Sequence, residues 1–199
     1  MKTNHGISSS MDRFLGQAIR RICHFRSISR RVSSAMVLAM KKRGQAQITS
    51  GRIELDSHAD TIVAGANYII MEYTGKACDV SPYRGDYKSV TNISIVHAAT
   101  AWQSPHTGQT YILVFHEVLW MGCHMNHSLI NPNQLRTKVR EQDDPTSDRP
   151  LLIITEDNSF CMELMMDGTV IYGLTTTPSE HELQNCPHVV LSHGIISKG

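Results

Sequence analysis

Residues 53–65 read IELDSHADTIVAG, which places two carboxylates and an imidazole on five residues between two runs of strand-forming residues. Ile53 and Leu55 alternate with polar residues, as in a strand with one buried face, and a second apolar run follows at residues 61–63. The polar corner between the two runs begins at Asp56. The stretch therefore predicts two short strands joined by a loop that carries a carboxylate at its start.

The same strand-like periodicity continues through the body of the chain, residues 51–199. Runs of β-branched and aromatic residues alternate there with loops that contain proline and glycine. These runs are residues 92–96, 110–115 and 151–154. Within residues 160–172, Asp167-Gly168 separates two apolar runs and suits the type I′ turn of a β-hairpin. We therefore predict a mainly β fold.

Two local features divide the chain into segments. Residues 142–150 are polar and contain two prolines, which is typical of a boundary loop. Just before this loop, residues 128–136 predict a short helix or turn, because Pro132 suits an early helical position. We expect a basic arm or linker at residues 1–50, a β domain at residues 51–140 and a β-rich, hairpin-containing segment at residues 141–199.

Charge is distributed unevenly along the chain. Residues 1–50 carry ten lysines and arginines against one acidic residue, whereas residues 51–199 carry nine against seventeen, so the two parts have net charges of +9 and −8. Apolar residues in the arm recur at steps of three and four, which predicts a basic, partly helical segment. These residues are Phe14, Ala18, Ile19, Ile22 and Phe25. Such an arm fits a solvated linker, an organelle transit peptide or a weak contact with nucleic-acid phosphates.

The five cysteines are widely spaced and contain no C-x-x-C pair, which argues against a disulfide framework or a zinc knuckle. We therefore expect a reducing, intracellular compartment, and the cytoplasm in particular. No apolar run approaches the roughly 18 residues of a membrane-spanning helix. The opening residues, MKTNHGISSS, lack the apolar core of a secretory signal. We expect no contact with a membrane.

A carboxylate at the end of an apolar strand, followed by a small hydroxyl residue, is the arrangement that an aspartic peptidase requires. Asp56 would lie at the base of a cleft, and Ser57 would fasten the loop. Peptide hydrolysis of this kind needs two aspartates that share a proton, so that one activates water while the other protonates the carbonyl oxygen. No second Asp-Ser/Thr-Gly sequence follows residue 60, so a second copy of the chain would supply the other aspartate in a two-fold symmetric homodimer. We expect an extended polypeptide substrate and no cofactor.

The sequence around Asp56 resembles the L-D-S-G-A signature of retropepsin-like aspartic proteases from copia-type LTR retrotransposon polyproteins, since residues 55–59 read LDSHA. Residues 117–121, EVLWM, and residues 127–135, HSLINPNQL, are similar to that family's N-V-L-Y-V-P and N-L-L-S-V-S-Q-L segments, in the same order and spacing. Residues 154–173 resemble the stretch between protease and integrase. The resemblance extends over residues 51–191 at the level of sequence pattern.

This resemblance implies a small retropepsin-like β-barrel at residues 51–140 and a pre-integrase spacer at residues 141–199. The activity that it implies is an aspartic endopeptidase that processes a retroelement polyprotein. Asp56 would be the catalytic residue, and the supporting loop would contain Ser57, His58 and Ala59.

The family also has a β-hairpin flap that closes over the substrate. Residues 97–110 occupy the corresponding place, with Pro105 and Gly108 able to form the tip and Trp102 then lining the cleft. The alternative is a surface hairpin whose tryptophan packs on the sheet. The sequence departs from the family at His58, where the signature has a glycine that permits close approach of the backbone. An imidazole there would crowd the loop or add a second titratable group beside the carboxylate.

Two other interpretations fit the same residues. An Asp-x-His-x-Asp pattern on an extended strand would place three metal ligands on one face, as in a metal-dependent hydrolase that generates hydroxide. These ligands would be Asp56, His58 and Asp60, and a second histidine and cysteine group lies at Cys123, His124 and His127. The third interpretation is a catalytically inactive retroelement remnant with the same fold.

Overall fold

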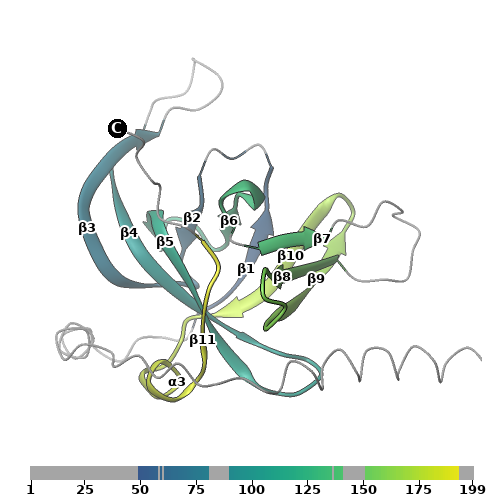
Figure 1. Ribbon diagram of the computed structural model, residues 1–199. Helices are drawn as coiled ribbons and strands as arrows, with labels where there is room; N and C mark the ends of the chain where they lie inside the picture. The colour runs from purple at the N-terminus through teal and green to yellow at the C-terminus, as the bar shows by residue number, and fades with distance from the viewer. Residues whose placement is uncertain are drawn as a thin grey trace, which may run out of the picture.

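The computed structural model describes residues 49–57, 59, 61–80, 90–135, 137–140 and 151–192, and these residues are mainly β (Figure 1). The mainly β prediction is therefore confirmed. The strands are β1 (Ser50–Leu55), β2 (Val63–Gly65), β3 (Ile69–Val80), β4 (Val90–Gln103), β5 (Thr110–Gly122), β6 (Ser128–Ile130), β7 (Thr137–Arg140), β8 (Leu151–Thr155), β9 (Cys161–Asp167), β10 (Val170–Thr176) and β11 (His188–Val190). The helices in the described residues are the 3₁₀ helix η1 (Pro132–Gln134) and the α-helix α3 (Glu180–Asn185).

The strands form a mixed sheet with the order β3-β4-β5-β2-β6-β1-β10-β9-β8-β7, and β11 pairs with β5. β10 also pairs with β4, through Thr176 and Ala101. This pairing returns the path to β4, so β4, β5, β2, β6, β1 and β10 form a closed circuit. Each strand of this circuit therefore has a neighbour on both sides, as in a closed barrel.

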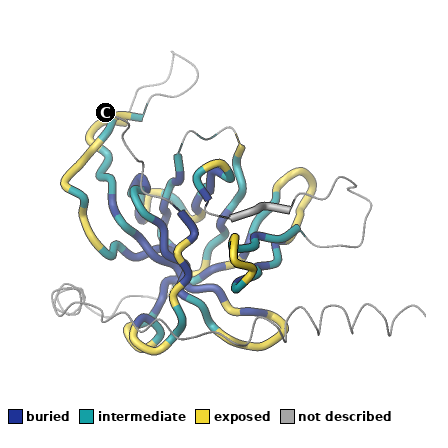
Figure 2. The backbone as a smooth tube through the Cα atoms, viewed as in Figure 1, coloured by how far each residue is buried: buried dark blue, intermediate teal, exposed yellow. Residues whose placement is uncertain are grey.

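The centre of β5 is buried on both faces, which explains its nearly continuous apolar sequence. Leu113 and Phe115 contribute to the larger core cluster inside the strand circuit. Ile112 and Val114 point to the other face, where they form a second cluster with Leu183 of α3. Figure 2 shows that many of the buried residues gather in the middle of the view. α3 is therefore positioned by one buried leucine against the outer face of the sheet.

The predicted hairpin at residues 160–172 is confirmed, but its turn lies one residue further along. Asp167 pairs with Val170, so the two turn residues are Gly168 and Thr169. Gly168 has a φ of +61°, and Thr169 is not among the residues with positive φ. This arrangement is typical of a type II′ turn, which requires glycine at its first central position.

The two body segments expected on either side of residue 140 share one core. β10 pairs with β1 over five residue pairs, from Ser50–Thr176 to Glu54–Tyr172. Ile153, Phe160 and Met162 belong to the same cluster as Ile53. Of the basic arm expected at residues 1–50, residues 1–48 lie outside the described residues, and Ser50 already belongs to β1.

Candidate functional site

Asp56 follows the last residue of β1 and begins the loop of residues 56–62 that leads to β2. Its backbone N–H donates to the carbonyl oxygen of Ile130 at 3.0 Å, and its own carbonyl accepts from the N–H of Ala59 at 3.4 Å. Asp56 and Ala59 are half-buried, whereas Ser57 is exposed in a turn. The carboxylate is thus held at the end of a strand, close to the protein surface.

The neighbour of β1 at this end is β6, which lies between β1 and β2. β6 pairs with β1 in parallel, from Ile53–Ser128 to Leu55–Ile130, and with β2 in antiparallel orientation through Val63 and Leu129. The loop of residues 56–62 therefore leaves β1, passes the end of β6 and enters β2. Because β1 and β6 are parallel, both reach this end of the sheet with their carboxyl termini.

The far end of the same loop is held by a side chain from η1. The backbone N–H of Ile62 donates to Gln134 Oε1 at 2.8 Å, and Gln134 Nε2 donates to Thr61 Oγ1 at 3.3 Å. η1 begins with Pro132, as predicted, and Asn131 caps it by accepting from the N–H of Asn133 at 2.8 Å. The predicted helical turn at residues 128–136 is thus confirmed for its second half, while Ser128–Ile130 is a strand.

A buried polar network joins β6 to the strands around it. Ser128 Oγ accepts from the N–H of Gly65 and donates to Asn67 Oδ1, both at 2.8 Å. Asn67 Nδ2 donates to Thr175 Oγ1 at 2.7 Å, and the Asn67 carbonyl accepts from Thr100 Oγ1 at 2.8 Å. All four polar side chains are at most 3% exposed. The network therefore ties β6 to β10, β4 and the segment after β2, because buried polar groups are costly unless they are paired.

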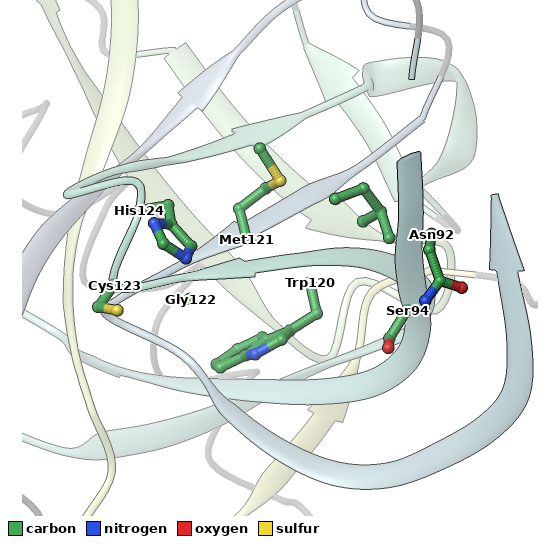
Figure 3. Close-up of a pocket in the computed structure, with 8 residues that line it drawn as sticks. Asn92, Ser94, Trp120, Met121, Gly122, Cys123 and His124 are labelled. Atoms are coloured by element: carbon green, nitrogen blue, oxygen red, sulfur yellow. The ribbon is translucent and has the colours of Figure 1, made fainter. Parts of the chain in front are cut away.

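An open hollow of about 500 Å³ lies where β4 and β5 separate, and Figure 3 shows the side chains that line it. The two strands pair up to Ile95 and Leu119, and beyond this point β4 pairs with β3 while β5 pairs with β2. The lining includes Ile93 from β4 and Trp120 and Met121 from β5. The lining thus combines these apolar side chains with the polar residues Asn92, Ser94 and His124. The N–H of Leu119 donates to the carbonyl of Ile62 at 3.0 Å, so β5 is bonded to the end of the Asp56 loop along its other edge.

The structure does not bring the residues of the predicted flap to Asp56. Pro105 and Gly108 lie in the turn between β4 and β5, where Gly108 has a φ of +68°. Thr110 begins β5, whereas Leu119 lies nine residues along it, roughly 30 Å away in an extended strand. This turn is therefore at the opposite end of the sheet from the Asp56 loop (Figure 1).

Of the two positions considered for Trp102, the structure shows the packed one and not the cleft. Its side chain is only 6% exposed and packs against the rings of Tyr111 and Phe160, at centroid distances of 5.9 and 5.6 Å. Tyr111 and Phe160 also contact each other. Burial of a large aromatic surface explains the position, because removing the indole from water is strongly favourable.

The metal alternative requires an extended Asp-x-His-x-Asp strand, but β1 ends at Leu55 and Ser57 lies in a turn. His58 and Asp60 themselves lie outside the described residues. Within the part of the chain that the structure describes, no three histidine, cysteine or acidic side chains are grouped so that they could hold a metal ion. Cys123, His124 and His127 all lie exposed on the segment that follows β5.

A histidine pair that the sequence does not predict lies on the β4–β5 hairpin. His97 Nδ1 and His116 Nδ1 are 3.1 Å apart, and the N–H of Glu117 donates to His97 Nδ1 at 3.2 Å. The strand register shifts here, and Glu117 has a φ of +52°, as expected for a β-bulge. Lys76 forms an ion pair with Glu117 Oε1 at 2.8 Å. No local spacing indicates this cluster, because its members come from three strands.

Neither helix in the described part of the chain is long and apolar enough to cross a membrane. Comparisons with protein-family models, with curated proteins and with solved structures give no match.

Proposed function

We propose that this protein is an aspartic endopeptidase that acts as a homodimer, with Asp56 of each chain in one shared site. The observation that carries the proposal is the position of Asp56. It directly follows a strand with a buried core residue, lies close to the surface, and begins a loop that is hydrogen-bonded at both ends. A catalytic carboxylate needs both access to substrate and a fixed position.

Two Asp56 carboxylates brought together by a two-fold axis would share one proton, because two like charges at short distance do not both ionise. The ionised carboxylate would take a proton from water as it attacks the peptide carbonyl. The protonated carboxylic acid would donate its proton to the carbonyl oxygen. The pair would then titrate as one coupled unit.

The closed circuit of β4, β5, β2, β6, β1 and β10 supports the further proposal of a retropepsin-like barrel. In this interpretation the barrel includes β10, so it extends beyond residue 140. The resemblance of residues 55–59, 117–121 and 127–135 to copia-type proteases supports the same proposal. Processing of a retroelement polyprotein is the corresponding biological role.

The substrate that the site fits best is an extended polypeptide. Asp56 is half-buried and Ser57 is exposed, so the start of the loop is open to a chain that approaches from solvent.

The test compares Asp56→Asn with a control, Asp167→Asn, which removes an exposed carboxylate in the β9–β10 turn region. Both variants and the wild type are incubated with an unstructured peptide library at roughly pH 4 to 7, the range suited to a carboxylate pair, with and without an aspartic-peptidase inhibitor. We expect Asp56→Asn to lose cleavage while keeping its melting temperature, and Asp167→Asn to retain cleavage. The Asp56→Asn dimer should be slightly tighter in sedimentation, since like-charge repulsion is removed.

Undiminished cleavage by Asp56→Asn would refute the mechanism. A second variant, His58→Gly, restores the glycine of the family signature and should raise activity if the imidazole only crowds the loop. If the wild type and His58→Gly both form a folded dimer and neither cleaves any peptide, the inactive-remnant interpretation is supported instead.

A further inference from the structure

The loop that carries Asp56 is attached at both ends to one short segment of the chain. At its start, the N–H of Asp56 donates to the carbonyl of Ile130, the last residue of β6. At its end, the N–H of Ile62 donates to the side chain of Gln134, four residues further along the same segment. The described ends of the loop are therefore held by β6 and η1 together.

The backbone around Gln134 is held by contacts other than those with the loop. Its backbone N–H donates to the carbonyl of Asn131 at 3.1 Å, within η1. The next residue, Leu135, is buried in the main core cluster and bridges to Ser192. The backbone that carries the Gln134 side chain is therefore held on both sides, by the hydrogen bond within η1 and by the burial of Leu135.

The side-chain amide of Gln134 satisfies both partners of this contact. Gln134 Oε1 accepts from Ile62, whose side chain is 1% exposed, and Nε2 donates to Thr61 Oγ1. A primary amide is the side-chain group that offers an acceptor and a donor on one rigid plane at neutral charge. Losing the acceptor would leave a partly buried backbone N–H without its partner, and the loop would have to shift to satisfy it.

We infer that Gln134 is a positioning residue, which fixes the Asp56 carboxylate by holding the far end of its loop. This inference rests on the proposed function, because its effect on turnover presupposes that Asp56 is catalytic. The side-chain hydrogen bonds of Gln134 go to Thr61 and Ile62, and it acts through these two residues. A shift of about 1 Å in a catalytic group lowers turnover by up to roughly 100-fold.

The test uses three variants of the full chain. Gln134→Met has a similar length and makes neither hydrogen bond. Gln134→Glu keeps an acceptor for the N–H of Ile62, and the hydroxyl of Thr61 can rotate to donate to the new carboxylate. Asn133→Ala changes an exposed side chain on the same turn and serves as the control.

We expect Gln134→Met to lower kcat by about 10- to 100-fold with KM changed by less than about threefold, which is the pattern of a lost transition-state geometry. Gln134→Glu should recover most of the lost kcat, and Asn133→Ala should match the wild type. Hydrogen exchange of the Ile62 amide should accelerate in Gln134→Met only. The ¹³C signal of the Asp56 carboxyl group should move in the same variant. Should Gln134→Met not fold, Gln134→Asn, whose amide is one methylene too short, takes its place.

Unchanged kcat in Gln134→Met, or unchanged Ile62 exchange and Asp56 signal, overturns the inference. A lower melting temperature with normal kcat also overturns it, since that would show a merely structural role. If no variant and no wild-type sample cleaves peptide, the proposed function fails and the exchange and ¹³C measurements decide the inference. Changes confined to Gln134→Met then support the positioning of Asp56, and their absence refutes it.

Discussion

Truncation of Asn67 to alanine tests whether the buried polar network holds β6 between β1 and β2. The Asn67 side chain accepts from Ser128 Oγ at 2.8 Å and donates to Thr175 Oγ1 at 2.7 Å, and neither Asn67 nor Ser128 is exposed to solvent. Leaving a buried polar group without its partner costs about 1–3 kcal/mol. Ser128 keeps its bond from the N–H of Gly65, so its share falls at the lower end of this range. We expect Asn67→Ala to lower the free energy of unfolding by about 2–4 kcal/mol.

The assay is equilibrium unfolding in urea, with Asn133→Ala as an exposed asparagine control that should change stability by less than about 0.5 kcal/mol. Adding Thr175→Val to Asn67→Ala removes the hydroxyl that the first change leaves without its donor. The double variant should therefore be more stable than the sum of the two single changes predicts, because their energies are coupled through one hydrogen bond. Additive effects, or a loss below about 1 kcal/mol for Asn67→Ala, would refute the reasoning.

Two further predictions concern close packing and the arm. Gly65→Ala should cost about 3 kcal/mol because the added Cβ would meet two backbone carbonyl oxygens at 2.5 and 2.7 Å, whereas Gly173→Ala should cost about 1 kcal/mol, since its nearest contact is the flexible end of Met162. Urea midpoints check this contrast, and equal losses would contradict it. Deleting residues 1–48 should move the melting temperature by no more than a few degrees, whereas deleting residues 1–52 removes half of β1 and should lower it by more than about 5 °C. Failure of the shorter deletion to fold would show that the arm contributes to the core.

Local sequence patterns identified the features that depend on residues a few positions apart. The alternation around Ile53 and Leu55 predicts β1, and Pro132 predicts the turn that became η1. Gly168 predicts a hairpin, although its turn is shifted by one residue. The capping box of Ser179 and Glu182 in α3 was visible in the sequence, but six residues are too few to show a helical period.

Other elements have weak local signals. The sequence does not predict β3, because most of its residues are exposed or half-buried and their pattern is interrupted around Gly75. The sequence predicts a helical turn where β6 lies, because three residues are too few to show alternation. The hydrogen-bond partners of a short strand lie elsewhere in the chain. Whether such a segment forms a strand therefore depends on the tertiary structure around it.

The sequence by itself determined that the body is β-rich and that Asp56 stands at the end of a strand with a buried residue at its centre. Only the tertiary structure decided that β6 enters between β1 and β2, that Gln134 holds the Asp56 loop, and that Trp102 belongs to the core. The physical reason is the range of the interactions. Alternation and turn chemistry act between near neighbours, whereas the bond from Ile62 to Gln134 spans 72 residues and forms only when distant strands have packed together.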